Sequence, residues 1–192
     1  YLSLTKYKYR HYFISAMILF LIICIYTHRL PNVNSVNNNK YILTSPSFGR
    51  IVKIDTVKDF TRISILLHIY DIHTQHIPTT GTITKNVYKF NDLNQSNFTK
   101  KRKINEITKT YIKPEYDEDS LIIIQQIAGI IPRDVINFTE EGDKLNKGDL
   151  FGIIQIGSRV DLFIPTVDIE TILVDVGERV YGPETPIIKI NK

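Results

Sequence analysis

The 192-residue sequence contains no tryptophan, a single cysteine, Cys24, and a single methionine, Met17. One cysteine excludes a disulfide framework and a zinc site built from cysteines. The net charge is only +4, and the basic residues are scattered along the chain without forming a stripe. We therefore expect no nucleic-acid partner, although the mild basicity suits an anionic membrane surface.

An uncharged apolar run covers residues 12–26, with Lys6, Lys8 and Arg10 before it and Arg29 after it. It is shorter than the roughly 20 residues that span a bilayer comfortably. Basic flanks and a tyrosine at each end favour a membrane anchor over residues 1–30. A secretory signal lacks its small-residue cleavage site here, and a buried core helix is the third alternative. We predict a membrane location, and since the chain starts at Tyr1, we expect further residues before it.

Residues 31–40 are rich in asparagine and form the predicted linker to a domain over residues 41–192. Short runs of Ile, Val, Thr and Tyr, separated by Gly, Pro, Asn and Asp, predict a mainly β domain. The expected strands cover residues 51–54, 62–70, 121–127, 134–138, 150–156 and 160–164. The polar segment 86–109, with a basic run at 100–103, predicts a long excursion that is either solvated or in contact with lipid headgroups.

Two internal echoes refine this fold. Pro46-x-x-Gly49-x-Ile51 recurs 32 residues later at 78–83, which predicts two turns with glycine at the awkward backbone angle. Residues 141–149 recur 35 residues later at 176–184, as strand–turn–strand units of the kind that biotinyl and lipoyl domains use. We predict a compact β-sandwich of the barrel-sandwich-hybrid type. A carrier domain itself is disfavoured, because its lysine usually stands beside a methionine and Met17 lies in the apolar run.

The pair Gly157-Ser158 lies between two expected strands and places a hydroxyl directly after the most permissive backbone residue. A serine hydroxyl needs a base to become a nucleophile, and two histidines, His73 and His76, lie upstream. On a strand their spacing would put them on opposite faces, but the proline and glycine that follow predict a turn, where both could point into one cleft. Two surface histidines, or a zinc site that includes Asp71, are the alternatives.

Residues 42–190 resemble the phosphatidylserine decarboxylase family, specifically its shorter bacterial-type members. The segment 26–31 also looks like the aromatic-basic-proline motif that follows the membrane segment in these enzymes. The resemblance rests on an ordered set of motifs: Ser45-Pro46 with Gly49, Asp71-Ile72-His73 with Pro78 and Gly81, Asn105-Glu106 weakly, residues 126–129, Glu141-Gly142-Asp143, Gly148, Phe151-Gly152, and residues 157–161 with Pro165.

The resemblance implies a proenzyme that cuts itself between Gly157 and Ser158, so that fragments 1–157 and 158–192 form a heterodimer. Its cofactor would be a covalent pyruvoyl group derived from Ser158. The cleaved enzyme would convert the membrane phospholipid phosphatidylserine to phosphatidylethanolamine. A homodimer is a further expectation, by analogy with related enzymes, which are often dimers. By position, His73 matches the histidine assigned to decarboxylation, and His76 matches the base for self-cleavage.

The sequence departs from the family at Phe48, where members usually carry the aspartate that orients the activating histidine. Losing such a carboxylate costs about 10⁴ in rate in serine-triad enzymes. Asp71 or Asp55 could replace it. The alternative is a non-catalytic lipid-binding relative that keeps the fold and processes poorly.

Overall fold

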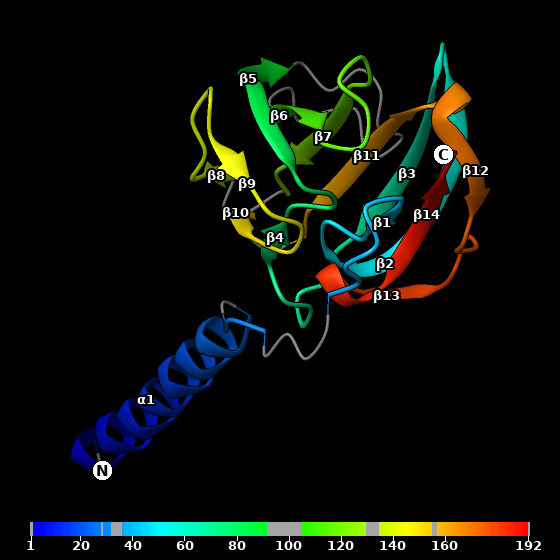
Figure 1. Ribbon diagram of the computed structural model, residues 1–192. Coiled ribbons are helices and arrows are strands. Elements are labelled where there is room, and N and C mark those ends of the chain that lie inside the picture. The colour runs from blue at the N-terminus through cyan, green and yellow to red at the C-terminus, as the bar shows by residue number, and fades with distance from the viewer. Residues whose placement is uncertain are drawn as a thin grey trace.

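The computed structural model describes residues 2–27, 29–31, 36–91, 105–129, 135–154 and 157–191. One long helix, α1 (Leu2–Thr27), precedes the β domain and projects away from it (Figure 1). The mainly β prediction is confirmed, with the strands curled around a common interior (Figure 1). The finer barrel-sandwich arrangement stays a prediction.

Helix α1 carries apolar side chains all round its surface. Phe13, Ile18, Phe20 and Ile25 are all exposed. A helix that is hydrophobic on every side is stable where lipid or a protein core covers it. Its stretch Tyr9–Tyr26 has a mean hydropathy of 1.6, with none of its 18 residues buried against the rest of the chain. By length and composition it can cross a membrane, a test that a signal sequence also passes.

The strands form one large and two small antiparallel sheets. The large sheet has the order β13-β2-β3-β11-β7-β6-β5-β9, and the small sheets have the orders β1-β14-β12 and β4-β10-β8. The bounds are β1 (Ile42–Thr44), β2 (Phe48–Val57), β3 (Phe60–Leu66), β4 (Thr74–His76), β5 (Gly81–Asn91), β6 (Asn105–Pro114), β7 (Ile122–Ile127), β8 (Val135–Asn137), β9 (Lys144–Leu145), β10 (Leu150–Ile154), β11 (Arg159–Pro165), β12 (Ile169–Ile172), β13 (Arg179–Tyr181) and β14 (Pro186–Ile190).

Strand β11 is the centre of the large sheet and pairs with β3 on one side and β7 on the other. Its residues Val160, Leu162 and Ile164 are fully buried, and they face the core because alternate residues of a strand share a face. Across from them, Ile65 of β3 pairs with Val160, and Ile124 of β7 pairs with Leu162. Burying aliphatic side chains of this size contributes about 1.5–3 kcal/mol each, so β11 anchors the core.

Most expected strands correspond to observed ones, namely β2, β7, β8, β10 and β11, with residues 155–156 outside the described ranges. The strand expected over 62–70 ends at Leu66. The excursion expected over 86–109 is wrong at both ends, because β5 runs to Asn91 and β6 starts at Asn105. Lys85, Tyr88 and Lys89 face solvent from β5, and this polarity disguised a strand. The basic run 100–103 lies outside the described residues.

The sequence echoes form equivalent structures. Gly142 donates its amide to the Ile83 carbonyl at 2.8 Å, and Gly177 donates to the Ile51 carbonyl at 2.8 Å. Both glycines have φ of 96°. Each later echo therefore packs on one earlier echo in the same way. The expected backbone angle is right for Gly49, whereas the φ of Gly81 is not positive and its Cβ would lie 2.4 Å from the Lys113 carbonyl oxygen.

The two earlier echoes also cross each other. The Thr44 amide donates to the Pro78 carbonyl at 3.0 Å, and the His76 amide donates to the Pro46 carbonyl at 2.9 Å. These bonds are related by the 32-residue repeat, so the two segments exchange equivalent hydrogen bonds about a local pseudo-twofold axis. A bridge between Ser47 and Gln75 lies beside them. The crossing therefore places the Phe48 segment directly against the His76 segment.

Gly49 offers a test of this packing, because a Cβ there would lie 2.3 Å from the Leu66 carbonyl oxygen and its φ is +149°. We expect Gly49→Ala to lower the free energy of unfolding of the full chain in detergent by about 2–5 kcal/mol. Gly177→Ala is the control, because its φ is also positive but a Cβ meets nothing within 4 Å. That variant should lose only about 1–2 kcal/mol. Equal losses in urea titrations would contradict the close approach at Leu66.

Candidate active site

Ser158 immediately precedes the central strand β11. It is 1% exposed, and its carbonyl accepts a hydrogen bond from the Leu67 amide at 2.9 Å. Its hydroxyl oxygen has no hydrogen-bond partner in the part of the chain that the structure describes. The preceding Gly157 is exposed and has a φ of +79°, in the region that favours glycine. A buried serine hydroxyl thus follows an exposed glycine of positive φ.

Two further buried polar side chains lie on the same inner face as Ser158. Val160, two residues after Ser158, pairs with Gln126 of β7, and Gln126 pairs with Thr108 of β6. Gln126 Oε1 and Thr108 Oγ1, like Ser158 Oγ, lack hydrogen-bond partners within the described ranges. Each such atom costs about 1–3 kcal/mol of stability. Three of them on one face mark an interior built for something other than stability.

His73 is fully buried at the end of β10 that leads toward Ser158. Its carbonyl accepts hydrogen bonds from the Ile154 amide at 3.1 Å and from Gln75 Nε2 at 2.7 Å. Gln75 Oε1 in turn accepts from Gln126 Nε2 at 3.2 Å. The backbone of His73 is therefore linked to the polar face that carries Ser158.

Gly152 of β10 makes room for this link. A Cβ at Gly152 would lie 2.7 Å from Gln126 Nε2 and 2.7 Å from the Ile136 carbonyl oxygen. Only glycine therefore lets Gln126 approach β10 closely, which gives the Phe151-Gly152 motif a physical reason.

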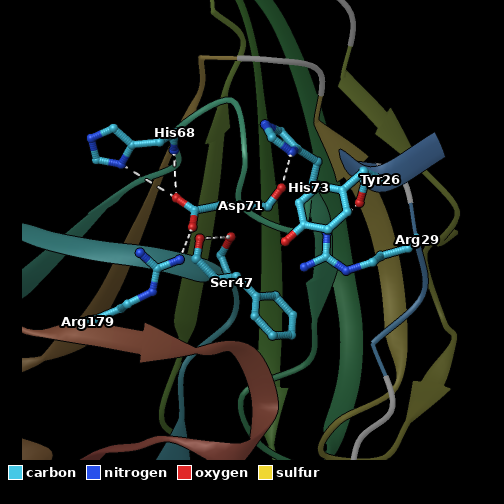
Figure 2. A network of polar contacts seen from close by, with 8 residues as sticks. Tyr26, Arg29, Ser47, His68, Asp71, His73 and Arg179 are labelled. Atoms are coloured by element: carbon cyan, nitrogen blue, oxygen red, sulfur yellow. Dashed lines mark hydrogen bonds and ion pairs between the residues drawn. The ribbon is translucent and has the colours of Figure 1, made fainter. Parts of the chain in front are cut away.

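The ring of His73 has a defined tautomer. Its Nδ1 lies 2.7 Å from the Asp71 carbonyl oxygen (Figure 2). A carbonyl oxygen can only accept, so Nδ1 carries the proton and Nε2 holds the lone pair of the neutral ring. His73 is thus prepared to take up a proton at Nε2.

His76 lies at the opposite end of β10, where it pairs with Leu150. Its Nδ1 donates to the Gly148 carbonyl at 2.8 Å, and its Nε2 accepts from the Thr74 hydroxyl at 3.1 Å. Burial lowers the pKa of His76 below its ordinary value of 6.5, an effect that the Gly148 hydrogen bond and the charge of Asp149 partly offset. At neutral pH the imidazole is an uncharged base of fixed tautomer.

The structure corrects the sequence prediction for these histidines. Residues Thr74–His76 form strand β4 rather than a turn, because β10 pairs with them, and the turn follows at Pro78. Both rings are buried, so the surface-histidine alternative is wrong. Ser158 Oγ hydrogen-bonds to neither ring. Within the described residues, no group of three or more His, Cys, Asp or Glu side chains could hold a metal ion.

Phe48, which stands where the resemblance predicted an aspartate, packs edge-on against His76, with ring centroids 6.1 Å apart. The carboxylates suggested as substitutes lie elsewhere. Asp71 binds Arg179, and Asp55 binds Arg62 at 2.7 and 2.8 Å on the β2–β3 hairpin. The Arg62 hydrogen bond lowers the pKa of Asp55 to about 2. The polar partner of His76 Nδ1 is therefore the Gly148 carbonyl, a backbone group that side-chain patterns could not reveal.

An open pocket lies between the residues that follow α1 and the β domain. Arg29, Leu30 and Pro31 line it on one side, and Phe48, Ile72, Tyr181 and Glu184 on the other. Arg29 packs over the Tyr26 ring at 3.8 Å from its centroid (Figure 2). Ile72 directly precedes His73, so the segment that carries the buried histidine forms part of one wall of this pocket.

Comparison with known proteins identifies the family of this chain. The phosphatidylserine decarboxylase family matches residues 22–188. The phosphatidylserine decarboxylase proenzyme of Wolbachia pipientis wMel is 36% identical over 182 residues, which cover 89% of this chain and 77% of the relative. That of Ehrlichia chaffeensis is 36% identical over 172 residues, covering 85% and 74%. No solved structure matches. The chain belongs to the phosphatidylserine decarboxylase family.

Proposed function

We propose that the chain is a membrane-anchored proenzyme that cleaves itself between Gly157 and Ser158 and then decarboxylates phosphatidylserine to phosphatidylethanolamine. The names of the matched relatives support this activity and the existence of a precursor form. The observation that carries the proposal is the buried Ser158 hydroxyl, which follows a glycine of positive φ and lacks a hydrogen-bond partner among the described residues.

Self-cleavage begins when Ser158 Oγ adds to the Gly157 carbonyl carbon and gives its proton to a base. The peptide C–N bond breaks as the Gly157 ester on Oγ forms. Elimination then removes the Ser158 Cα proton, forms a Cα–Cβ double bond, breaks the Cβ–Oγ bond and releases Gly157 as a carboxylate. The resulting enamine takes a proton at Cβ and becomes an imine. Water replaces the nitrogen, which leaves as ammonia, so the fragment 158–192 begins with a pyruvoyl group.

The glycine contributes its backbone angle to this step. A Cβ at Gly157 would meet nothing within 4 Å, so glycine is needed for conformation rather than for space. Glycine adopts this angle without strain, so Gly157 sets the direction of the scissile peptide at little energetic cost. The Leu67 amide fixes Ser158 through its carbonyl, so the serine is held while the preceding peptide is open to attack.

We assign the base to His76, as the family resemblance implies. Its Nε2 must exchange the Thr74 hydroxyl for Ser158 Oγ before the attack, because the two groups are not hydrogen-bonded in the structure. The Gly148 carbonyl fixes its tautomer in the manner of the orienting carboxylate of a catalytic triad, and its Nε2 is the basic atom. A neutral carbonyl does not stabilise the imidazolium as a carboxylate does, so cleavage should be slow. The reaction occurs once per molecule, and a slow rate suffices.

The residues around Ser158 fit a pyruvoyl group. Gln126 Oε1, on the neighbouring strand β7 and without a hydrogen-bond partner among the described residues, can accept from the amine of a serine headgroup. When present, the pyruvoyl carbonyl supplies an electron sink for decarboxylation, the task of pyridoxal phosphate elsewhere. His73, with Nε2 as its basic atom, would hold the proton that replaces CO₂ on the substrate carbon.

Cleavage would leave the strand pairing of the fold intact. The fragment 158–192 contributes β11, which is paired with β3 and β7 of the larger fragment, so the two form a heterodimer with a shared core. Helix α1 would lie in the membrane, and the pocket beside Arg29 would open toward phospholipid headgroups. Because the residues that follow α1 line this pocket, a phospholipid in the anchoring membrane would lie next to it.

The cleavage proposal predicts a fragment of residues 158–192 with a blocked N-terminus that lacks the serine amine. Ser158→Ala should abolish this fragment, because the attacking oxygen is gone. Ser64→Ala is the control, since Ser64 is equally buried on the adjacent strand β3. Denaturing gels and intact mass of the full chain in detergent measure both. A wild-type chain that stays intact would overturn the pyruvoyl mechanism.

The two histidines should separate the two reactions. His76→Ala should slow self-cleavage by about 10²–10⁴. His73→Ala should leave cleavage intact and lower CO₂ release per cleaved chain by a similar factor. Protonation inactivates a base, and burial lowers the pKa of His76 below its ordinary value of 6.5. Wild-type cleavage should therefore keep its rate at neutral pH and fall at a more acidic pH than an unperturbed histidine would give. Normal cleavage and decarboxylation in both variants would contradict these roles.

Phe48→Asp tests the missing carboxylate. A charge beside His76 should stabilise the imidazolium and accelerate self-cleavage, up to about 10⁴-fold. Loss of the buried ring should destabilise the fold by about 3–5 kcal/mol. Phe48→Asn is the matched control, because it makes the same cavity without the charge. Cleavage at the wild-type rate in the folded Asp variant would mean that another group already performs this task.

A further inference from the structure

Asp71 is a buried carboxylate with partners on both sides. It is 2% exposed, yet it stands in the irregular segment between β3 and β4. Its Oδ2 accepts from the His68 amide at 2.8 Å, and the His68 ring nitrogen Nδ1 lies 3.5 Å away. Its Oδ1 binds the Arg179 guanidinium (Figure 2). The carboxylate is therefore fixed by one residue of its own loop, His68, and by one distant residue, Arg179.

The same residue holds His73 through its backbone. The Asp71 carbonyl accepts from His73 Nδ1 at 2.7 Å, on the side away from the carboxylate contacts (Figure 2). Any rotation of the Asp71 peptide would release that ring. The orientation of His73 thus depends on what fixes Asp71, and the strongest such contact is a charged one.

Arg179 comes from the other side of the cleavage point. It lies on β13, within the predicted fragment 158–192, whereas Asp71 and His73 belong to residues 1–157. Its guanidinium carbon is 5.7 Å from the centroid of Tyr70 and 5.8 Å from that of Tyr181, so two rings restrict its movement. A planar guanidinium held in this way binds a carboxylate with a defined geometry, which a lysine ammonium does not reproduce.

We propose that Arg179 is a positioning residue for His73, acting through Asp71 to keep the His73 ring in its Nδ1–H tautomer on the Asp71 carbonyl. The inference rests on the proposed function for the purpose of this orientation, but the contact and the tautomer can be measured without any activity. The predicted fragment 158–192 would then contribute Arg179 to the orientation of His73, in addition to carrying Ser158.

The tautomer is read by ¹⁵N NMR of histidine-labelled full chain in detergent, carrying Ser158→Ala so that it stays uncleaved. In that chain His73 should show a protonated Nδ1 and an unprotonated Nε2. Adding Arg179→Met should convert these signals to a mixture of tautomers, and Arg179→Lys should restore them in part. Arg50→Met is the control, since Arg50 pairs directly with Arg179 across the sheet but donates to the Gly177 carbonyl. Unchanged His73 signals in Arg179→Met would overturn the proposal.

Kinetics in the cleaving chain supply the second readout. Arg179→Met should lower kcat for CO₂ release per cleaved chain by about 10²-fold, with KM and the self-cleavage rate close to wild type. Asp71→Asn, which preserves shape, should act alike if Arg179→Met fails to fold, and the double variant should be no worse than either single one. Additive losses would overturn the coupling.

These outcomes separate the two proposals. A wild-type chain that neither cleaves nor releases CO₂ contradicts the proposed function, whatever the His73 signals show. A wild-type chain that does both, with Arg179→Met keeping full kcat, contradicts only the role of Arg179.

Discussion

The reciprocal backbone hydrogen bonds from Thr44 to Pro78 and from His76 to Pro46 are the constraint on which the site depends. Because each segment serves as both donor and acceptor, neither can shift its register without losing both bonds. The crossing sets Phe48 against His76 and turns the chain so that β4 can pair with β10. The two copies of the 32-residue sequence repeat are thus joined to each other by equivalent hydrogen bonds, and this contact brings residues 44–48 against residues 76–78.

The position of Ser158 makes self-cleavage compatible with a stable fold. The proposed scissile peptide lies just before the central strand β11, so cutting there would remove a connection and leave the pairing intact. Each new fragment alone would expose the aliphatic face of β11 or of its neighbours. Burial of that face would hold the fragments together, and the ion pair between Asp71 and Arg179 would add a directional contact near His73.

Sequence patterns predicted the parts of this protein that repeat or alternate. The strands rich in isoleucine, the pair at Gly157-Ser158 and the two histidines followed from composition, backbone chemistry and motif order. Strand β4 did not, because three residues are too few to show a period and the proline after them signals a turn. Arg179 and Asp71 are 108 positions apart and share no local pattern. The hydrogen bond from His76 to the Gly148 carbonyl could not be predicted from the sequence, since every residue carries a backbone carbonyl.

The Gly148 carbonyl explains how His76 can be oriented although Phe48 stands where the resemblance predicted an aspartate. An orienting carboxylate does two things for a histidine: it selects the tautomer and it stabilises the cation that forms. The Gly148 carbonyl does the first, but it stabilises the cation only enough to offset part of the burial effect, while the Phe48 ring packs edge-on against the imidazole. The histidine is left correctly oriented but harder to protonate, in agreement with its lowered pKa. Such a base would suit the proposed self-cleavage, which each molecule performs once. The proposed decarboxylation would instead rely on His73, whose orientation we infer to be fixed by the ion pair between Asp71 and Arg179.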